Sequence, residues 1–268
     1  MKRLSGILCA LVLCVACVPR PSAQLPVWRE SVVASIRANS VAITVFYTLT
    51  AEEYQRQIKE PKSIFMSDQI GSPENKIIGR IGAGTLIGDN YILTVRHLFI
   101  QDTGVVERTI WVMFCDDDHP IQADVVVLSK GEKDYDDYAL IKLREPVPGI
   151  GVPIANRSPE TGEDVAFVGS LKRSAFFIRF LRVTRFQQQF TIDDAGALHL
   201  SNREEFAFTC VYPSGPGDSG GGVFNTRGEL VGILYFGRTL DMETFVFSNP
   251  IEMARTFLIA NGQEALLK

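Results

Sequence analysis

The sequence predicts an all-β protein, built as a barrel or sandwich and closed by a C-terminal helix. Short apolar segments recur along most of the chain, and in the clearest of them apolar and smaller side chains alternate. Turn residues, mainly glycine, asparagine, aspartate and proline, separate these segments. A clear apolar stripe with helical spacing appears near the C-terminus. Many short strands with turn signals between them are typical of all-β folds.

The first predicted strand covers residues 40–50, where Val41, Ile43, Val45 and Tyr47 alternate with smaller or more flexible residues. A period of two places these four side chains on one face of a sheet. Glycine kinks interrupt the next strand, and a Gly-Asp-Asn turn follows it. Further strands are expected over residues 76–88, 91–95, 109–114, 121–128, 138–143, 164–168, 176–185, 206–211, 221–224, 230–236 and 244–247.

Two helices are predicted outside the sheet. Thr50 and Glu53 have the spacing of a capping box, so a short surface helix should follow Thr50. At the other end of the chain, Asn249 is expected to cap a helix whose first residue is Pro250, with Glu252 completing a second capping box. The apolar stripe of this helix consists of Ile251, Ala254, Phe257 and Leu258, and it should pack on the sheet.

The N-terminus has the features of an export signal. Lys2 and Arg3 precede an apolar run over residues 7–16 that is too short to span a bilayer. We therefore expect residues 1–16 to be a signal peptide. The run ends in Cys-Val-Ala-Cys, which resembles the bacterial lipoprotein processing box and implies lipidation of Cys17. Ordinary signal cleavage, for example after Ala23, is the alternative.

The resulting localisation is the bacterial periplasm or cell envelope, with a membrane anchor if Cys17 is lipidated. Residues 17–39 are predicted to be a tether, because their first half is rich in proline and polar residues. The folded domain should cover residues 40–262.

Composition and charge exclude several classes of partner. The chain of 268 residues has a formal net charge of −4 and no basic cluster, which argues against nucleic acid. Outside the leader the only cysteines are Cys115 and Cys210, and we favour two buried free thiols over a disulfide. These cysteines lack metal-ligand spacing, and we expect neither a metal nor another cofactor.

A serine within a glycine-rich loop is the first candidate for chemistry. Ser219 lies in Gly-Pro-Gly-Asp-Ser-Gly-Gly-Gly. A nucleophilic serine needs a base, room for a carbonyl group, and backbone N–H groups directed at the developing oxyanion. Glycines provide room and unusual backbone conformations, but the same run is also compatible with a structural turn.

The search for a base is short because the chain has only three histidines. His97 directly follows a strongly apolar strand, where it can be held over a cleft. His119 lies in a charged segment that we interpret as a solvated loop rather than a metal site, and His199 as an ordinary strand residue. The orienting acid is expected to be Asp137, because it leads directly into a buried strand, unlike its neighbours Asp134 and Asp136.

Three sequence blocks together resemble the signature blocks of the trypsin-like serine proteases. These blocks are Thr-Val-Arg-His ending at His97, Asp-Tyr-Ala-Leu starting at Asp137, and Gly-Asp-Ser-Gly-Gly around Ser219. The order His, Asp, Ser fits this family and excludes the subtilisin and α/β-hydrolase orders. The resemblance implies two six-stranded antiparallel β-barrels with a C-terminal helix, the N-terminal barrel over about 40–145 and the C-terminal barrel over about 146–262.

The resemblance also implies roles for individual residues. Ser219 would be the nucleophile, His97 the general base and Asp137 its orienting acid. The backbone N–H groups of Gly217 and Ser219 would form the oxyanion hole. A polypeptide substrate would lie along Tyr235, Phe236 and Gly237 as an added strand.

Specificity is the least defined property. Pro213 stands where trypsin has the acid that selects lysine and arginine, which favours a small or apolar substrate side chain. Arg238 instead favours an acidic one. The lack of disulfides is similar to the cysteine-poor bacterial branch of the family. Lys76-Ile77-Ile78-Gly79 resembles an activation site, but we interpret it as plain strand because cleavage there would cut the first barrel.

The function predicted from the sequence is an exported serine endopeptidase that works through an acyl-enzyme. The alternatives are a catalytically silent binding module with the same fold and an esterase or acyltransferase using the same nucleophile. The oligomeric state is left open.

Overall fold

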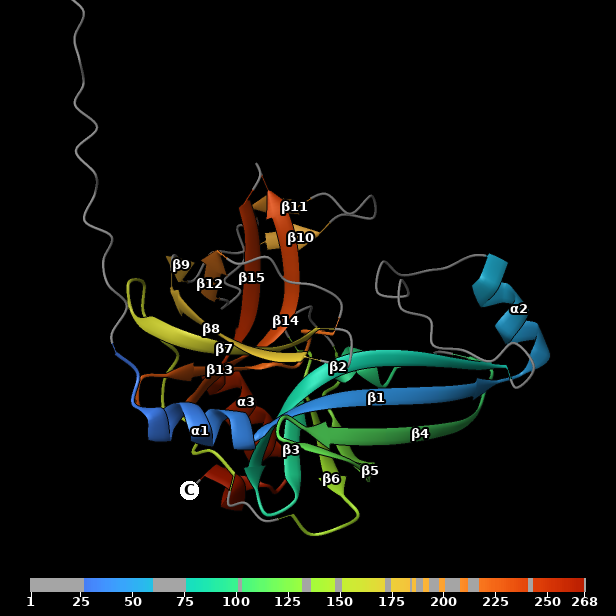
Figure 1. Cartoon of the computed structure of the whole chain (residues 1–268). Helices are drawn as coiled ribbons and strands as arrows, with labels where there is room; N and C mark the ends of the chain where they lie inside the picture. The colour runs from blue at the N-terminus through green and yellow to red at the C-terminus, as the bar shows by residue number, and fades with distance from the viewer. Residues whose placement is uncertain are drawn as a thin grey trace, which may run out of the picture.

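The computed structural model describes residues 27–59, 76–100, 103–131, 136–147, 151–171, 175–183, 185–186, 190–192, 198–200, 208–211, 217–240 and 243–267. It is mostly β-structure arranged as two lobes (Figure 1). Within this part of the chain no helix is both long and apolar enough to cross a membrane.

The N-terminal lobe is a closed six-stranded barrel with the strand order β1-β2-β3-β6-β5-β4. All of its neighbouring strands are antiparallel. Its strands are β1 (Ser40–Leu49), β2 (Ile77–Gly88), β3 (Tyr91–Thr94), β4 (Val105–Phe114), β5 (Asp117–Leu128) and β6 (Ala139–Leu143). The predicted first barrel is therefore confirmed.

Strand β1 shows why this barrel closes. The side chains of Val41, Ile43, Val45 and Tyr47 are buried and fill its interior, as the alternation predicted. Residues Ile77 and Ile78 belong to β2 and pair with β1, so their interpretation as strand rather than activation site is confirmed.

The C-terminal lobe differs from the prediction of a second closed barrel. It is a seven-stranded sheet with the order β8-β7-β13-β14-β15-β12-β9. Its strands are β7 (Asp164–Leu171), β8 (Ala175–Arg182), β9 (Arg185–Phe186), β12 (Phe208–Val211), β13 (Gly222–Asn225), β14 (Leu230–Leu240) and β15 (Glu243–Pro250). Within the described residues this sheet does not close: β8 and β9 are its two edges, and β10 (Phe190–Ile192) pairs with β11 (Leu198–Leu200) in a separate two-stranded sheet.

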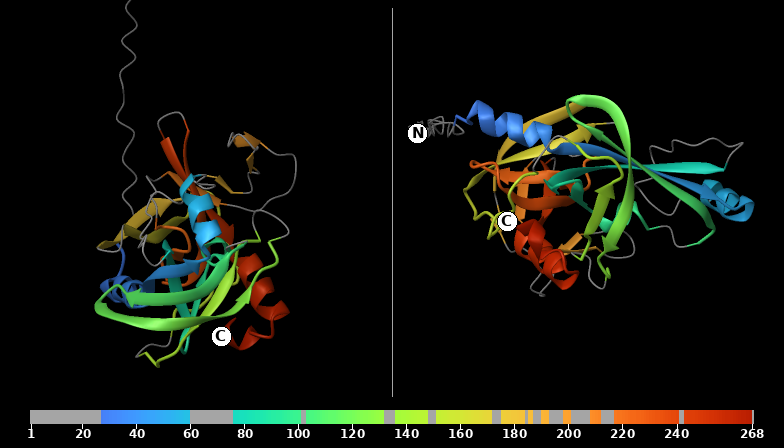
Figure 2. Two further views of the ribbon diagram at one scale, coloured as in Figure 1. Left: turned by 90° about the vertical axis from the view of Figure 1, so that its right-hand side faces the viewer. Right: turned by 90° about the horizontal axis from the view of Figure 1, so that it is seen from below.

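Helix α1 (Glu30–Ala38) occupies part of the segment that we expected to be a tether, and the tether prediction is wrong over these residues. Its Ile36 is fully buried, and the carbonyl oxygen of Ile36 accepts a hydrogen bond from the Ser40 hydroxyl at 2.7 Å. Just before the helix, the ring of Trp28 packs 5.2 Å from that of Phe180 in β8. The chain is therefore already attached to both lobes before the first strand begins (Figures 1 and 2). The outer boundaries of the domain stay a prediction.

Helix α2 (Ala51–Lys59) follows β1 as predicted. The Thr50 hydroxyl accepts the backbone N–H of Glu53 at 3.3 Å, which confirms half of the capping box. The Glu53 carboxylate, however, turns to Arg56, Gln57 and Thr103 instead of the start of the helix.

Helix α3 (Ile251–Ala260) buries the predicted stripe of Ile251, Ala254, Phe257 and Leu258. Its predicted start is wrong by one residue, because Pro250, and not Asn249, is the N-cap residue and Ile251 is the first helical residue. A proline supplies no side-chain cap, and a residue distant in sequence does so: Ser158 Oγ accepts the backbone N–H of Ile251 at 2.9 Å. The Glu252 carboxylate in turn accepts the N–H and O–H of Ser158.

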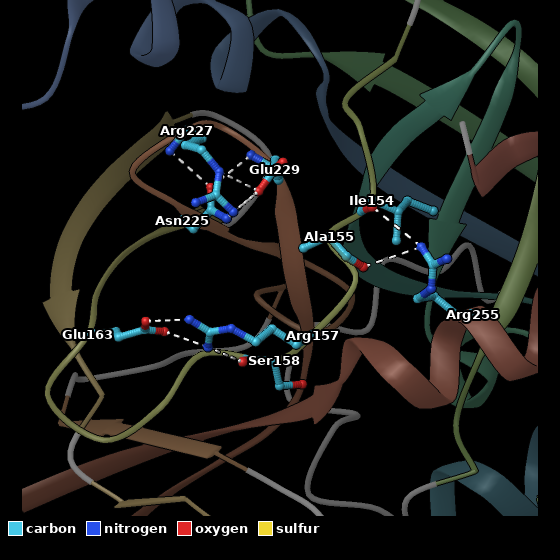
Figure 3. A network of polar contacts seen from close by, with 9 residues as sticks. All are labelled: Ile154, Ala155, Arg157, Ser158, Glu163, Asn225, Arg227, Glu229 and Arg255. Atoms are coloured by element: carbon cyan, nitrogen blue, oxygen red, sulfur yellow. Dashed lines mark hydrogen bonds and ion pairs between the residues drawn. The ribbon is translucent and has the colours of Figure 1, made fainter.

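Two further contacts attach α3 to both lobes. The Tyr138 hydroxyl, at the start of β6, donates to the Pro250 carbonyl at 3.0 Å. Burial raises the pKa of Tyr138 well above its usual value of 10, so the hydroxyl keeps the proton that it donates. Arg255 of α3 points to the carbonyl oxygens of Ile154 and Ala155, in the segment that joins the lobes (Figure 3).

Candidate active site

His97 lies in a short 3₁₀ turn (Arg96–Leu98) that directly follows β3. Strand β3 is anchored by Ile92 and Leu93, which are fully buried in the barrel. The side chain of His97 itself is 29% exposed. The apolar strand therefore leads into a turn that holds the histidine, partly exposed, at the edge of the barrel.

Strand register brings Asp137 to His97. Strands β3 and β6 are antiparallel, and Thr94 is opposite Ala139 at the last pair. Beyond this pair, Asp137 lies next to the turn that carries His97. Its Oδ2 atom is 2.5 Å from Nδ1 of His97, and its Oδ1 atom accepts the backbone N–H of His97 at 2.8 Å. One carboxylate thus fixes both the backbone and the ring of the histidine.

A serine that the sequence analysis did not identify holds the Asp137 segment. The hydroxyl of Ser129 donates to the carbonyl of Asp136 at 2.6 Å and accepts the N–H of Tyr138 at 3.0 Å. These two partners are the residues on either side of Asp137. Asp136, the rival candidate for the orienting acid, instead uses its carboxylate to accept the backbone N–H of Gly131 at 2.8 Å.

The Ser219 loop has the backbone conformations that its glycines suggest. Gly217 has φ +101° and Gly220 has φ +90°, which L side chains rarely adopt. The loop is held by backbone hydrogen bonds on both sides: Gly220 N–H donates to the Leu234 carbonyl in β14 at 2.7 Å, and the Ser219 carbonyl accepts Ala83 N–H in β2 at 2.7 Å. The loop therefore bridges the two lobes.

The loop and the histidine turn meet at the same residue of β2. A Cβ atom added at Gly82 would lie 2.3 Å from Leu98 Cδ1 and 2.9 Å from the Ser219 carbonyl oxygen. Leu98 directly follows His97 in the sequence. The structure thus brings the Ser219 loop and the turn that bears His97 together at one glycine, where no side chain fits.

Asp218 is almost completely buried beside the candidate nucleophile, with 1% of its surface exposed. Its Oδ1 atom lies where a side chain at Gly169 of β7 would be, only 2.6 Å from that hypothetical Cβ. Its carbonyl oxygen accepts Gly221 N–H at 3.0 Å. The residue is therefore part of the folded loop and sits within the lobe.

The predicted substrate residues Tyr235, Phe236 and Gly237 all lie in β14. Strand β13 pairs with β14 only as far as Ile233, whereas β15 follows β14 to Leu240. Pro213 and Cys17, the residues predicted for specificity and lipidation, lie outside the described residues, as does the expected signal peptide.

The remaining candidates are separate from this site. His119 is exposed near the start of β5, and its N–H donates to the carboxylate of Asp117 at 2.9 Å. His199 lies in β11. Among the described residues, no group of three histidine, cysteine, aspartate or glutamate side chains could hold a metal ion. Cys115 is a free thiol that is only half-buried, and burial raises its pKa.

A cavity of about 420 Å³ lies elsewhere, between the segment that joins the lobes and the turn between β13 and β14. Its charged side chains are already paired: Arg157 with Glu163, Arg227 with Glu229 (Figure 3), and Asp164 with Arg182. It contains none of the candidate catalytic residues. This cavity is therefore a less suitable site for chemistry than the region where His97, Asp137 and the Ser219 loop come together.

Comparison with known proteins agrees with the observed fold. The solved structure of the Rv3671c protease from M. tuberculosis in its active form is similar to this chain with a TM-score of 0.60 at 19% identity, covering 91% of this chain and 94% of that one. The inactive form of the same protease gives a TM-score of 0.58 at 18% identity and covers 87% of this chain and 93% of that one. At these identities the similarity shows the fold alone. A search of curated protein sequences found no match.

The sequence profile described as "Trypsin-like peptidase domain" matches residues 82–233. The match runs from the strand that receives the Ser219 loop, through His97 and Asp137, to the strand behind the loop. Since it covers more than half of the chain, the protein belongs to the trypsin-like peptidase domain family.

Proposed function

We propose that this protein is a serine endopeptidase in which His97, Asp137 and Ser219 form the catalytic triad. The observation that carries the proposal is the contact of 2.5 Å between His97 Nδ1 and Asp137 Oδ2, in a turn that shares Gly82 with the Ser219 loop. In this arrangement Nδ1 would carry the imidazole proton and Nε2 would be the unprotonated nitrogen, which is the tautomer that a general base requires.

The steps follow from these positions. Nε2 of His97 takes the hydroxyl proton of Ser219 as Oγ attacks the carbonyl carbon of the scissile bond. The tetrahedral intermediate collapses when His97 gives that proton to the leaving amine, which produces an acyl-enzyme. Water then attacks the acyl carbonyl carbon while His97 takes one of its protons, and the second tetrahedral intermediate collapses when His97 gives this proton to Ser219 Oγ, which releases the acid and the free serine. Asp137 stabilises the imidazolium during each step.

The oxyanion would be bound by the backbone N–H groups of Gly217 and Ser219. Gly217 supports this role because its φ of +101° turns the backbone in a way that a residue with a side chain resists. Losing one such donor typically raises the barrier by about 3–4 kcal/mol.

The substrate would be an extended polypeptide that pairs with β14 over Tyr235, Phe236 and Gly237. The proposal is supported by the end of β13 pairing at Ile233, which leaves the following part of β14 beside the Ser219 loop. Main-chain pairing of this kind favours peptides over simple esters. A small, apolar or acidic side chain next to the scissile bond would be selected near Pro213 and Arg238.

A fluorophosphonate probe tests the nucleophile directly. The processed wild type should be labelled at Ser219, while Ser219→Ala and His97→Ala should not react. The matched control is His119→Ala, because His119 is exposed and lies apart from the His97 turn; this variant should be labelled like the wild type. A folded wild type that does not react would favour the silent binding module. If labelling occurs, hydrolysis of esters but of neither casein nor a peptide library would favour the esterase.

We also propose that the protein is exported and anchored to the cell envelope through lipidated Cys17. The support is the apolar run of the leader and the small residue before the cysteine. The variant Cys17→Ser should move the mature protein from the detergent fraction to the soluble fraction. A wild type already found in the soluble fraction would support ordinary signal cleavage.

A further inference from the structure

The turn that carries His97 is held by hydrogen bonds that side chains of the barrel donate to its backbone carbonyl groups. A 3₁₀ turn leaves most of its carbonyl groups without partners inside the turn. Here one carbonyl, that of Arg96, accepts the N–H of Phe99 at 2.9 Å. The next four carbonyl groups along the chain all accept hydrogen bonds from side chains that belong to other strands of the barrel.

Three side chains make these bonds, and we call them the carbonyl cradle. Arg80 donates to the carbonyl of His97 at 2.7 Å and to that of Ile100 at 2.5 Å. Tyr47 donates to the carbonyl of Leu98 at 2.6 Å, and Arg108 to that of Phe99 at 3.1 Å. Residues 97, 98, 99 and 100 are thus each tied to the barrel by one bond.

The barrel itself sets the geometry of the cradle. Tyr47 of β1 is directly opposite Arg108 of β4, and Arg80 of β2 is opposite Val45, two residues before Tyr47. The guanidinium of Arg80 lies over the Tyr47 ring, 5.5 Å from its centre. Both Val45 and Tyr47 are buried, so the cradle is built on the inner face of the barrel wall. Of the three donors, Tyr47 is buried, Arg80 is half-buried and Arg108 is exposed, so the packing of the barrel restrains Tyr47 and Arg80 most.

The three side chains of the carbonyl cradle also keep the protons that they donate. Burial raises the pKa of Tyr47 to about 12, against the lowering effect of Arg80 and Arg108. Its hydroxyl therefore remains a donor at any pH at which a protease of this class works. Arginine is charged throughout the same range, and charged donors make stronger hydrogen bonds than neutral ones.

We propose that Arg80 is a positioning residue for His97, acting with Tyr47 and Arg108 to fix the height and rotation of the histidine turn relative to Ser219. Asp137 fixes the ring from one side, and the cradle fixes the backbone from the other. This proposal rests on the proposed peptidase function, because its consequence is the alignment of Nε2 with the Ser219 hydroxyl.

The position of His97 relative to Ser219 affects the rate of the chemical step more than it affects substrate binding. A shift of about 1 Å in a catalytic group can cost roughly a hundredfold in rate. The substrate is expected to bind along β14, in the other lobe, so losing the cradle should leave KM nearly unchanged. If Arg80 only stabilised the fold, its loss would lower the fraction of folded enzyme. Each folded molecule would then keep the kcat and the KM of the wild type.

The test compares four variants of the processed protein by peptide hydrolysis, with active sites counted by fluorophosphonate titration. Arg80→Met keeps the aliphatic stem and removes the donors, and should lower kcat by about tenfold to a hundredfold, with KM within about twofold of the wild type. Arg80→Lys should recover part of this loss, as should methylguanidinium added to Arg80→Met. Tyr47→Phe removes one donor from the ring that Arg80 covers and should show a smaller loss of kcat.

The matched control is Arg144→Met. Arg144 also makes hydrogen bonds with its guanidinium, to Asp124 and Gln122, but it is exposed and does not contact the His97 turn. It should keep the kcat of the wild type. An unchanged kcat in Arg80→Met, or an equal loss in Arg144→Met, would overturn the proposal.

A second measurement separates this proposal from the peptidase function. The Nδ1 proton of His97, bonded to Asp137, should give a far-downfield NMR signal that can be followed in the inactive Ser219→Ala background. Arg80→Met should shift or broaden this signal, while Arg144→Met should not. A wild type without peptidase activity would reject the proposed function but leave this readout valid, and an unchanged signal in Arg80→Met would reject the cradle.

Discussion

The carboxylate of Asp137 contacts both the side chain and the backbone of His97. Oδ2 lies 2.5 Å from the ring nitrogen Nδ1, and Oδ1 accepts the backbone N–H at 2.8 Å. The aspartate is mostly shielded from solvent, with 14% of its side chain exposed. Two bonds from one rigid group fix the rotation of the ring as well as its position, so a change in that group should affect catalysis more than folding.

Replacing Asp137 by asparagine should therefore lower kcat by about 10⁴-fold near neutral pH. The amide would offer one donor in place of an acceptor, and the imidazole would adopt the tautomer whose Nε2 carries a proton. That ring cannot accept the proton of Ser219. The measurement is peptide hydrolysis at pH 7 together with thermal unfolding, which should change little.

Asp124→Asn is the control for this substitution. Asp124 is an exposed aspartate whose carboxylate binds Arg144, and it is not part of the proposed triad. Its kcat should equal that of the wild type. An Asp137→Asn enzyme with nearly full activity would show that Asp137 is not the orienting acid.

Ser129→Ala should make the position of Asp137 less fixed, although Asp137 itself is unchanged. The hydroxyl joins the residues on both sides of Asp137, and the substitution removes a donor to Asp136 O and an acceptor for Tyr138 N–H. Because this site is buried, the loss should lower the free energy of unfolding by about 1–3 kcal/mol. We also expect kcat to fall while KM stays constant, because Asp137 lies between the two residues that the Ser129 hydroxyl holds.

Ser129→Thr retains the hydroxyl and serves as the matched variant. It should recover most of the lost kcat in peptide hydrolysis, with unfolding followed by urea titration. If Ser129→Ala lowered stability alone, with kcat per active site unchanged, the hydroxyl would support the fold but not the aspartate.

Gly220→Ala should disrupt the packing of the Ser219 loop against β2 and β3. Gly220 has φ +90°, and a Cβ there would lie 2.1 Å from the Ala83 carbonyl oxygen and 2.3 Å from Thr94 Oγ1. The first of these atoms is backbone and cannot rotate away. Gly162 has nearly the same φ, +91°, with no atom within 4 Å of its hypothetical Cβ.

Comparing Gly220→Ala with Gly162→Ala therefore separates the cost of backbone strain from the cost of a steric clash. Gly162→Ala should cost only the strain of a left-handed residue, about 1–2 kcal/mol, and should keep full activity. Gly220→Ala should cost clearly more and lose fluorophosphonate labelling, measured beside urea unfolding. Equal stability losses in the two variants would mean that the loop moves away from β2 at no further cost.

The sequence was sufficient for the parts of the fold that depend on local pattern. The alternation of Val41, Ile43, Val45 and Tyr47 predicted a strand whose side chains are in fact buried in the barrel. The candidate residues His97 and Asp137 were identified by their places at strand ends. Antiparallel register then brings them together, and that register is a property of the whole barrel.

The parts that the sequence did not predict depend on distant contacts. The cap of α3 comes from Ser158, which is 93 residues before the N–H that it accepts. The second barrel was carried over from a resemblance, whereas the described strands form an open sheet with β8 at one edge and β9 at the other. Arg80 had one local signal, a single charge within a strand of apolar residues and glycines, but its partners were visible only in the fold.

Glu53 should make the stability of the N-terminal lobe depend on pH in the acid range. Hydrogen bonds from Arg56, and then from Gln57 and Thr103, lower the pKa of Glu53 from 4.5 to about 2. The ionised carboxylate joins α2 to the start of β4. Because the folded pKa lies below the unfolded one, this stabilisation is complete above about pH 4.5 and is lost as the pH falls towards 2.

The measurement is urea unfolding of the wild type and of Glu53→Gln between pH 2 and pH 7. The free energy of unfolding should differ most at pH 7, and the difference should shrink through the window from about 4.5 to about 2. Glu52→Gln changes an exposed carboxylate in the same turn of α2 and should differ from the wild type by much less. A difference between wild type and Glu53→Gln that stayed constant across this window would mean that the charge of Glu53 does not stabilise the fold, because only an effect of the charge disappears when the carboxylate is protonated.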